Sequence, residues 1–424
     1  MNIKNIYHGD IKLNWSFDEK RSLESLGTPL VIQLDDVLEI NDTITIKIEY
    51  ETTHKSGAIQ WLTKEMTLGK RFPFMFTQCE SAYARSMTPC QDTPSSKVQV
   101  EAFLKVLKPL VALYSGKLVE VSEDKQYFIY HYIQDVVVPT YLIAIAVGKL
   151  EYRSLGERTG VWAEVEMVGK AEYEFVDTEK FVEIAEQYVD VPYEWGVYNI
   201  LVLPTGFPFG GMENPNLTFV SPSIIAGDRS LANVIAHEIA HSWTGNLVTN
   251  KNWRNFWMNE GFTVFLERKI NQILYGKDIK NLMASVGYAG LLEDINKFGK
   301  TNSYTSLNPD IGNSNPDESF STVPYEKGYT FLTYLESLVG ETKFQTIFRG
   351  YIKKFKYQTV TTQDFQSFFT DSVHEQFNDK ESSDILSQVD WENWINQPGE
   401  PWIIPKFSIY YHFNLRFQIY NRSQ

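Results

Sequence analysis

Apolar and polar residues alternate along much of the first third of the chain, which is the pattern of strands with one buried face. Residues 43–50 and 126–133 show this period of two most clearly. We therefore predict that residues 1–150 form a β-rich N-terminal domain.

From residue 151 onward the apolar spacing becomes mainly helical. Residues 178–188 repeat apolar side chains every three or four positions after Asp177, a residue type that caps helices. Residues 326–395 have helical spacing as well, whereas residues 199–203 form a short apolar run that predicts a buried strand. The chain is therefore expected to be an α+β protein, with a second domain over residues 151–398.

The final segment, residues 399–424, does not continue the helical pattern. Apolar residues from Ile409 to Ile419 alternate with more polar neighbours, which is typical of a strand. We interpret this segment as a truncated tail.

One predicted helix carries His237 and His241 in the sequence His-Glu-Ile-Ala-His. Residues four apart share one helix face, so both imidazoles can reach a single cation. Glu260 follows nineteen residues after the second histidine. Two imidazoles and a carboxylate suit zinc and leave one position for water. The pattern predicts one Zn²⁺ per chain, although histidines on one face can also cap or pack without a metal.

Glu238 lies beside the predicted ligands, where it can take a proton from a zinc-activated water and return it to a departing amine. The alternative is a solvated surface glutamate. Asp228 or Ser230 is expected to cap this helix, and Gly245-Asn246 is expected to end it.

A second group of residues, 210–214, reads Gly-Gly-Met-Glu-Asn within a Gly/Pro-rich loop. Two glycines permit close backbone approach, so an extended peptide can pair with this segment as an added strand. Glu213 would then hold a free ammonium group, as in an enzyme acting at N-termini. The alternative is a Gly-rich turn with a solvated glutamate. Tyr325 is a candidate donor to a developing oxyanion, although most of the 24 tyrosines are expected to serve packing.

Composition narrows the function classes further. The formal net charge of -14 disfavours nucleic acid as a partner. Cys79 and Cys90 match no metal or redox spacing and are expected to be free thiols in a reducing compartment. The start shows no secretory signal, and the longest apolar run, 136–147, is interrupted by Pro139 and too short to span a membrane. We expect a cytoplasmic protein, with the nucleus as an alternative.

Together these blocks resemble the leukotriene A(4) hydrolase and aminopeptidase B branch of the zinc aminopeptidases, peptidase family M1. The matching stretches are 60–63, 89–95, 208–215, 233–246 with the continuation past Glu260, 323–328 and 389–391. The resemblance implies a saddle-like β-rich domain, incomplete here, followed by a thermolysin-like zinc domain over residues 151–398. It also implies that the family's helical C-terminal domain is largely missing.

The resemblance assigns roles by position. It implies zinc ligation by His237, His241 and Glu260, with Glu238 as general base and Tyr325 as the transition-state tyrosine. It implies substrate contacts from Gln78, Cys79, Glu80, Pro208, Phe209, Gly210, Gly211, Met212, Glu213 and Asp317.

The function expected from these assignments is that of a monomeric zinc aminopeptidase acting on short peptides with a free N-terminus. One alternative is a bifunctional enzyme that also hydrolyses the lipid epoxide leukotriene A(4). Asp317 favours this alternative, whereas Phe209 and Phe320 stand where leukotriene hydrolases commonly carry tyrosine, and Glu80 replaces a glutamine. A third interpretation is a truncated, inactive fragment that binds a peptide or a partner.

Overall fold

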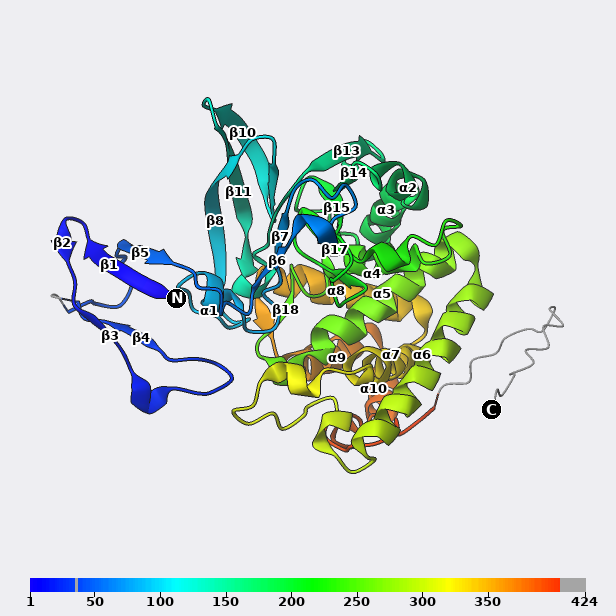
Figure 1. Cartoon of the computed structure of the whole chain (residues 1–424). Coiled ribbons are helices and arrows are strands. Elements are labelled where there is room, and N and C mark those ends of the chain that lie inside the picture. Colours follow the sequence, from blue (N-terminus) through cyan, green and yellow to red (C-terminus); the bar gives the residue numbers. More distant parts are fainter. Residues whose placement is uncertain (35–36, 405–424) are drawn as a thin grey trace, which may run out of the picture.

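The computed structural model describes residues 1–34 and 37–404 (Figure 1). The first part of the chain consists almost entirely of strands and the later part mainly of helices, which confirms the α+β class. The alternating segment 409–419 lies outside the described residues.

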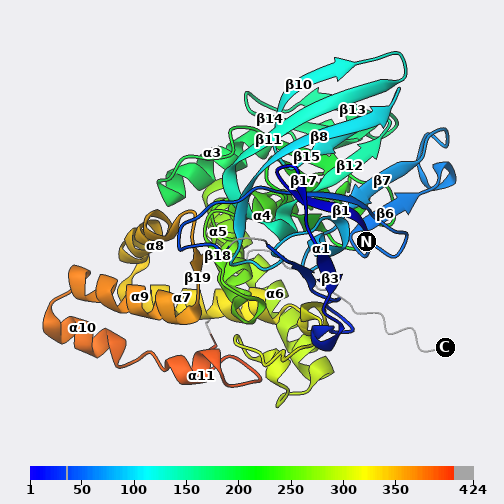
Figure 2. The same cartoon turned by 90° about the vertical axis from the view of Figure 1, so that its left-hand side faces the viewer.

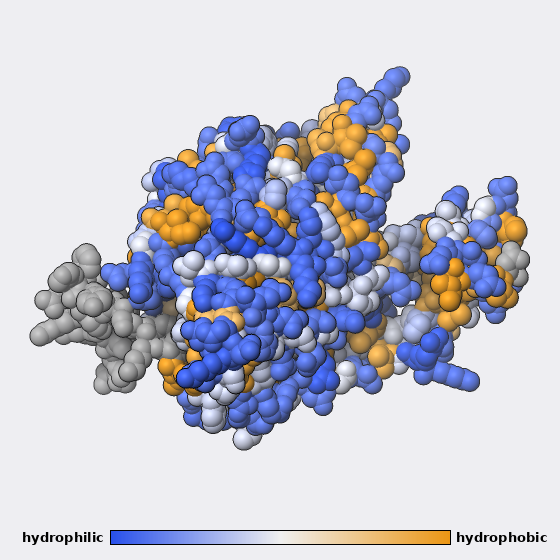
Figure 3. Space-filling model, turned by 180° about the vertical axis from the view of Figure 1, so that it is seen from behind, coloured by the Kyte–Doolittle hydropathy of each residue, from blue (hydrophilic) through white to orange (hydrophobic). Residues whose placement is uncertain are grey.

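The N-terminal strands form four small antiparallel sheets, ordered β2-β1-β5, β3-β4, β6-β7-β12-β9 and β10-β11-β8. Their bounds are β1 (Asn2–His8), β2 (Ile11–Lys12), β3 (Trp15–Phe17), β4 (Leu30–Ile32), β5 (Ile46–Glu51), β6 (Ile59–Leu62), β7 (Phe74–Thr77), β8 (Lys97–Leu107), β9 (Val111–Tyr114), β10 (Lys117–Glu123), β11 (Tyr127–Pro139) and β12 (Ile145–Gly148), with the short helix α1 (Ala84–Met87) after β7. The sheet β10-β11-β8 projects from the molecule, and exposed Phe103, Leu107 and Leu118 contribute to the apolar patch over it (Figure 3).

A five-stranded sheet begins the second half of the fold. Its order is β13 (Leu150–Ser154), β14 (Thr159–Glu164), β15 (Tyr198–Val202), β17 (Leu217–Val220) and β16 (Gly211–Met212). The strand predicted over residues 199–203 is β15, which is parallel to both of its neighbours and buried at its centre. Strand β16 is antiparallel to β17 and lies at the edge of the sheet. Its other side therefore has no strand partner among the described residues.

The remaining elements are mainly helices, and the later ones in the chain lie below the larger sheets in Figure 2. They are α2 (Val168–Glu174), α3 (Thr178–Val189), α4 (Asn233–His241), α5 (Trp257–Tyr275), α6 (Lys277–Phe298), the π-helical turn η8 (Val323–Lys327), α7 (Gly328–Val339), α8 (Glu341–Phe355), α9 (Thr362–Gln376), α10 (Asp379–Leu386) and α11 (Trp391–Ile395), with a two-stranded contact between β18 (Thr249–Asn250) and β19 (Thr359–Val360). The helical spacing over residues 326–395 is confirmed. Helix α5 is buried from Trp257 to Asn271, because α3, α4, α6, α7 and η8 pack against it.

The start of α4 differs from the prediction. No side chain caps this helix, and Asp228 instead accepts a hydrogen bond from the amide of Ser230 in the preceding turn. The loop before α4 is organised by Glu174 of α2, whose carboxylate accepts from the amides of Gly227 and Arg229. The predicted cap was wrong because α4 begins at Asn233 and its N-cap position is Ala232, which has no side chain that could accept a hydrogen bond. The helix also ends earlier than predicted, at His241.

An ion-pair network fixes α3 to the loop before β14. The guanidinium of Arg158 donates to Glu186 at 2.8 and 2.5 Å and to Glu179 at 2.8 Å, and Glu186 also accepts from the amide of Tyr193 at 2.6 Å. Burial on its own would raise the pKa of Glu186, but Arg158 and this amide lower it below its usual value.

We expect Glu186→Gln to lower the free energy of unfolding at pH 7 by about 1–2 kcal/mol, because it removes a charged acceptor from a partly solvated network. A carboxylate whose pKa is lowered on folding stabilises the folded state above its unfolded pKa of about 4.3 and loses that effect as pH falls through the folded value. The difference between parent and variant should therefore shrink below about pH 4. Denaturant unfolding at pH 7 and pH 3.5 measures this. Glu183→Gln, an exposed change on the same helix, is the control, and a difference that stays constant with pH would contradict the assignment.

None of the helices within residues 1–34 and 37–404 combines the length and the apolar character that a membrane-spanning helix needs.

Candidate active site

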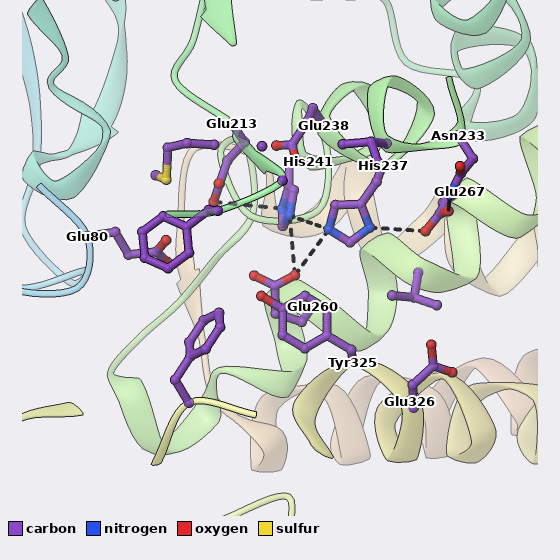
Figure 4. Close-up of a pocket in the computed structure, with 17 residues that line it drawn as sticks. Glu80, Glu213, Asn233, His237, Glu238, His241, Glu260, Glu267, Tyr325 and Glu326 are labelled. Carbon is purple, nitrogen blue, oxygen red and sulfur yellow. Dashed lines mark hydrogen bonds and ion pairs between the residues drawn. The ribbon is translucent and has the colours of Figure 1, made fainter. Parts of the chain in front are cut away.

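Two histidines lie on one face of α4, as their spacing predicted. The Nε2 atoms of His237 and His241 are 3.2 Å apart, and both rings face the same cavity (Figure 4). The opposite face of the helix carries Ile235 and Ile239, which are fully buried in the main core. Packing of this apolar face therefore directs the histidines toward the cavity.

Glu260 reaches the histidines from α5. Its Oε2 atom lies 3.5 Å from Nε2 of His237 and 3.3 Å from Nε2 of His241. Donors bound to a tetrahedral zinc at their usual bond lengths lie about 3.4 Å apart, so these separations suit one zinc ion. The Oε2 atom is buried and accepts no hydrogen bond from the residues that the structure describes. The donor set and its spacing thus fit zinc.

The other ring nitrogens of the histidines have partners that orient them. Nδ1 of His237 lies 3.1 Å from a carboxylate oxygen of Glu267, and Nδ1 of His241 lies 3.0 Å from the carbonyl oxygen of Thr244. Both partners are acceptors, so each Nδ1 is the protonated nitrogen and each Nε2 keeps its lone pair toward the cavity. Glu267 also accepts from the side chain of Asn233, which fixes its carboxylate.

Glu238 follows the first histidine and also lines the cavity. Its carboxylate lies so close to Gly211 of β16 that a Cβ atom there would be 2.1 Å from Oε1. Burial raises the pKa of Glu238 to about 8, although His237 and His241 act to lower it. Its Oε2 atom accepts no hydrogen bond within the described part of the chain.

Two further carboxylates face the candidate zinc ligands from different elements. Glu213 follows β16, and Glu80 lies three residues after β7 in the N-terminal domain. One oxygen from each of Glu80, Glu213 and Glu260 lies within 4.8 Å of the other two. Burial raises the pKa of both Glu80 and Glu213, and the negative charges of Glu213 and Glu260 raise that of Glu80 further. This arrangement favours a bound cation.

Tyr325 lies in η8 on the other side of the ligands. Its ring stacks on the ring of His237, with centroids 6.0 Å apart and planes 20° apart. Burial raises the pKa of Tyr325 well above its usual value, and nearby carboxylates such as Glu260 add to the rise. The phenol is therefore protonated at neutral pH and is a hydrogen-bond donor.

These side chains line one cavity of about 380 Å³. Most of the residues predicted from sequence meet there: Glu80, Phe209, Gly210, Gly211, Met212, Glu213, His237, Glu238, His241, Glu260 and Tyr325. Gln78, Cys79 and Pro208 do not line it. The side chain of Gln78 instead contacts the sulfur of Met212 at 3.3 Å, and Cys79 is buried in a separate apolar cluster of the N-terminal domain.

Asp317 lines an adjoining cavity of about 200 Å³. Its two carboxylate oxygens accept from the hydroxyls of Ser81 at 2.6 Å and Tyr83 at 2.8 Å. Glu80 and the rings of Phe209 and Phe320 border both cavities. The further aromatic walls are Trp253 and Phe256.

Sequence reasoning missed several cavity residues. Glu267 lies seven residues after Glu260 on α5, and Asn233 lies four residues before His237 on α4. Spacings of four and seven place residues on one helix face, so this periodicity is a signal that could have found them. Nothing comparable pointed to Trp253 or Phe256, which both lie in the segment just before α5.

Comparison with known proteins agrees with this geometry. The Peptidase family M1 domain matches residues 173–394, and the Peptidase M1 N-terminal domain matches residues 1–142. The chain belongs to peptidase family M1. The resemblance expected from the motifs is thereby confirmed.

Among relatives of this M1 chain, leukotriene A-4 hydrolase of Xenopus laevis is 47% identical over 388 residues, covering 90% of this chain and 62% of the relative. Leucine aminopeptidase 2 of Neosartorya fischeri is 40% identical over 403 residues, covering 93% of this chain and 64% of the relative. The structure of yeast LTA4 hydrolase in complex with bestatin matches with a TM-score of 0.87 and 39% identity, over 96% of this chain and 62% of that chain. The M1 chain therefore spans less than two thirds of the length of these relatives.

Proposed function

We propose that this M1 chain is a zinc aminopeptidase that releases the N-terminal residue of short peptides. The observation that carries the proposal is the group of buried carboxylates beside the candidate zinc ligands. Oε1 of Glu80 and Oε1 of Glu213 have no hydrogen-bond partner among the described residues. Buried carboxylates without partners are costly, and a peptide's α-ammonium group would satisfy them.

In this proposal, Glu80 and Glu213 hold the substrate amine, so the first peptide bond lies over the histidines. A zinc ion at His237, His241 and Glu260 supplies a Lewis acid that activates water and polarises a carbonyl. Glu238 takes the proton from the attacking water and returns it to the leaving nitrogen.

Tyr325 and strand β16 also have roles in the proposed reaction. The hydroxyl of Tyr325 donates to the carbonyl oxygen as negative charge develops on it. The open side of the edge strand β16 pairs with the extended substrate backbone, and Gly210 and Gly211 leave room for that approach.

The adjoining cavity favours a cationic first side chain. Asp317 and Glu80 contribute carboxylates to its lining, and Trp253, Phe256 and Phe320 contribute aromatic rings. A guanidinium or ammonium group would bind there through ion pairs with the carboxylates and through contact with the faces of the aromatic rings. We propose that arginine and lysine are the preferred N-terminal residues.

Metal analysis combined with a panel of aminoacyl-aminomethylcoumarins tests this function. We expect one zinc per chain, turnover that a chelator abolishes and added zinc restores, and the highest kcat/KM for arginyl and lysyl substrates. N-acetylated substrates are the matched control, because they lack the ammonium group. Equal turnover of acetylated and free substrates would refute the amine site. A fully zinc-loaded chain without turnover would instead favour a peptide-binding fragment.

The second candidate function is hydrolysis of a lipid epoxide in addition to peptides. The aromatic rings that line the adjoining cavity together with Asp317 favour it. Incubation with leukotriene A(4) and analysis of the products decides this point, since an enzymatic dihydroxy acid differs from the products of spontaneous hydrolysis.

A further inference from the structure

Two glycines bring the backbones of α5 and η8–α7 into direct contact beside the site. Gly261 follows the candidate ligand Glu260, and Gly328 lies three residues after Tyr325. A Cβ atom on Gly261 would lie 2.8 Å from Cα of Gly328 and 3.2 Å from the carbonyl oxygen of Pro324. A Cβ atom on Gly328 would lie 2.9 Å from Cα of Gly261. Neither position has room for a methyl group unless the two helices separate.

Backbone conformation does not explain these glycines. Gly328 has φ -61° and ψ -49°, which are ordinary helical angles for any residue. Gly261 lies in the first turns of α5, and both glycines are buried. Glycine in a helix costs about 1 kcal/mol of stability relative to alanine. The close approach of the two backbones is therefore the physical reason for glycine at both positions.

The residues between Tyr325 and Gly328 are fixed on two further sides. Glu326 accepts a two-pronged ion pair from Arg268 of α5, at 2.7 and 2.9 Å. The buried ammonium of Lys327 donates to the carbonyl oxygens of Thr305, Gln397 and Gly399 at 2.8–3.0 Å. The turn that carries the tyrosine is thus held against α5 by the ion pair and tied to the end of the described chain by the lysine.

We propose that the Gly261–Gly328 contact is a positioning device that sets the distance between Glu260 and the hydroxyl of Tyr325. This inference rests on the proposed function, because it gives the two glycines a role in transition-state stabilisation. A methyl group at either position pushes η8 away from α5 by an amount on the order of 1 Å, and displacements of this size at a reacting centre cost up to about a hundredfold in rate.

The test uses Gly261→Ala and Gly328→Ala in the full chain. We expect kcat to fall at least tenfold with KM within about twofold of the parent, because the amine anchors Glu80 and Glu213 lie on other elements. Zinc content should remain at one per chain. In the background of Tyr325→Phe, the alanine substitution should cost no more than twofold further, since the hydroxyl through which it acts is already absent.

Gly290→Ala is the matched control, because its Cβ atom would meet only the side chain of Thr322, at an ordinary 3.9 Å. Its kcat should equal that of the parent. Multiplicative losses in the Tyr325→Phe background, or loss of zinc in the alanine variants, would overturn the positioning role. If neither alanine variant folds, Gly287→Ala replaces them, because its methyl meets the Glu326 carboxylate rather than backbone. The same fall in kcat is then expected, and an unchanged kcat would overturn the inference.

A crystal structure of Gly261→Ala provides a readout that is independent of activity. We expect the separation between Glu260 and Tyr325 to increase by at least 0.5 Å, on the scale of a methyl group inserted between packed backbones. An unchanged separation would refute the inference even if the parent hydrolyses peptides. Absence of turnover in the parent would refute the proposed function and leave this structural comparison decisive.

Discussion

Glu238→Gln is expected to reduce hydrolysis of aminoacyl-aminomethylcoumarins by about 10³-fold or more, near the upper part of the range for general acid–base catalysis. The carboxamide keeps the size of the side chain but accepts no proton from water. Because the candidate ligands are His237, His241 and Glu260, zinc content should stay at one per chain. Steady-state kinetics and metal analysis on the same preparation measure both quantities.

Glu183→Gln is the control for this experiment, because it makes the same chemical change at an exposed position on α3. It should leave turnover unchanged. Undiminished turnover of Glu238→Gln would contradict the general-base assignment. Loss of zinc together with activity would instead give Glu238 a role in metal binding.

Tyr325→Phe is expected to lower kcat by about 10²–10³-fold, the typical effect of removing one donor to an oxyanion. The ring remains and keeps its stacking on His237, so KM should change little. An interaction made only in the transition state lowers kcat and kcat/KM equally, which distinguishes it from ground-state binding. Full kinetic curves for an arginyl substrate provide the measurement.

Tyr275→Phe serves as the matched control, because this exposed tyrosine at the end of α5 lies outside both cavities. A variant of Tyr325 in which only KM rises would assign the hydroxyl to substrate binding. A variant with wild-type kinetics would remove Tyr325 from the mechanism.

The histidine pair of the candidate metal site was predictable because its information is local. The four-residue spacing of His237 and His241 places both rings on one face of a helix, whatever the rest of the fold does. The position of Glu260 could not be predicted from local spacing, since its contact with the histidines depends on the packing of α5 against α4. Glu260 was assigned as the third candidate ligand because the motif around it resembles the one in M1 zinc aminopeptidases.

Contacts between the two domains were much less accessible from sequence. Glu80 and Glu213 are more than a hundred residues apart, yet their carboxylates meet beside Glu260, a candidate zinc ligand. Resemblance placed each beside a substrate, but no local pattern indicated that one oxygen of each would lie within 4.8 Å of the other and of Glu260. Cys79, one residue before Glu80, was predicted to line the site and lies instead in an apolar cluster of the N-terminal domain.

The sequence by itself determined the α+β class, the helices of the second domain and the histidine face, because periodicity and motif spacing are properties of adjacent residues. Only the tertiary structure decided how the end of β7, the edge strand β16, the helices α4 and α5 and the turn η8 surround one cavity. It also explained Gly261 and Gly328. Their role depends on two backbones meeting across sixty-seven residues of sequence, and such a meeting is fixed by packing of the whole fold rather than by any local preference.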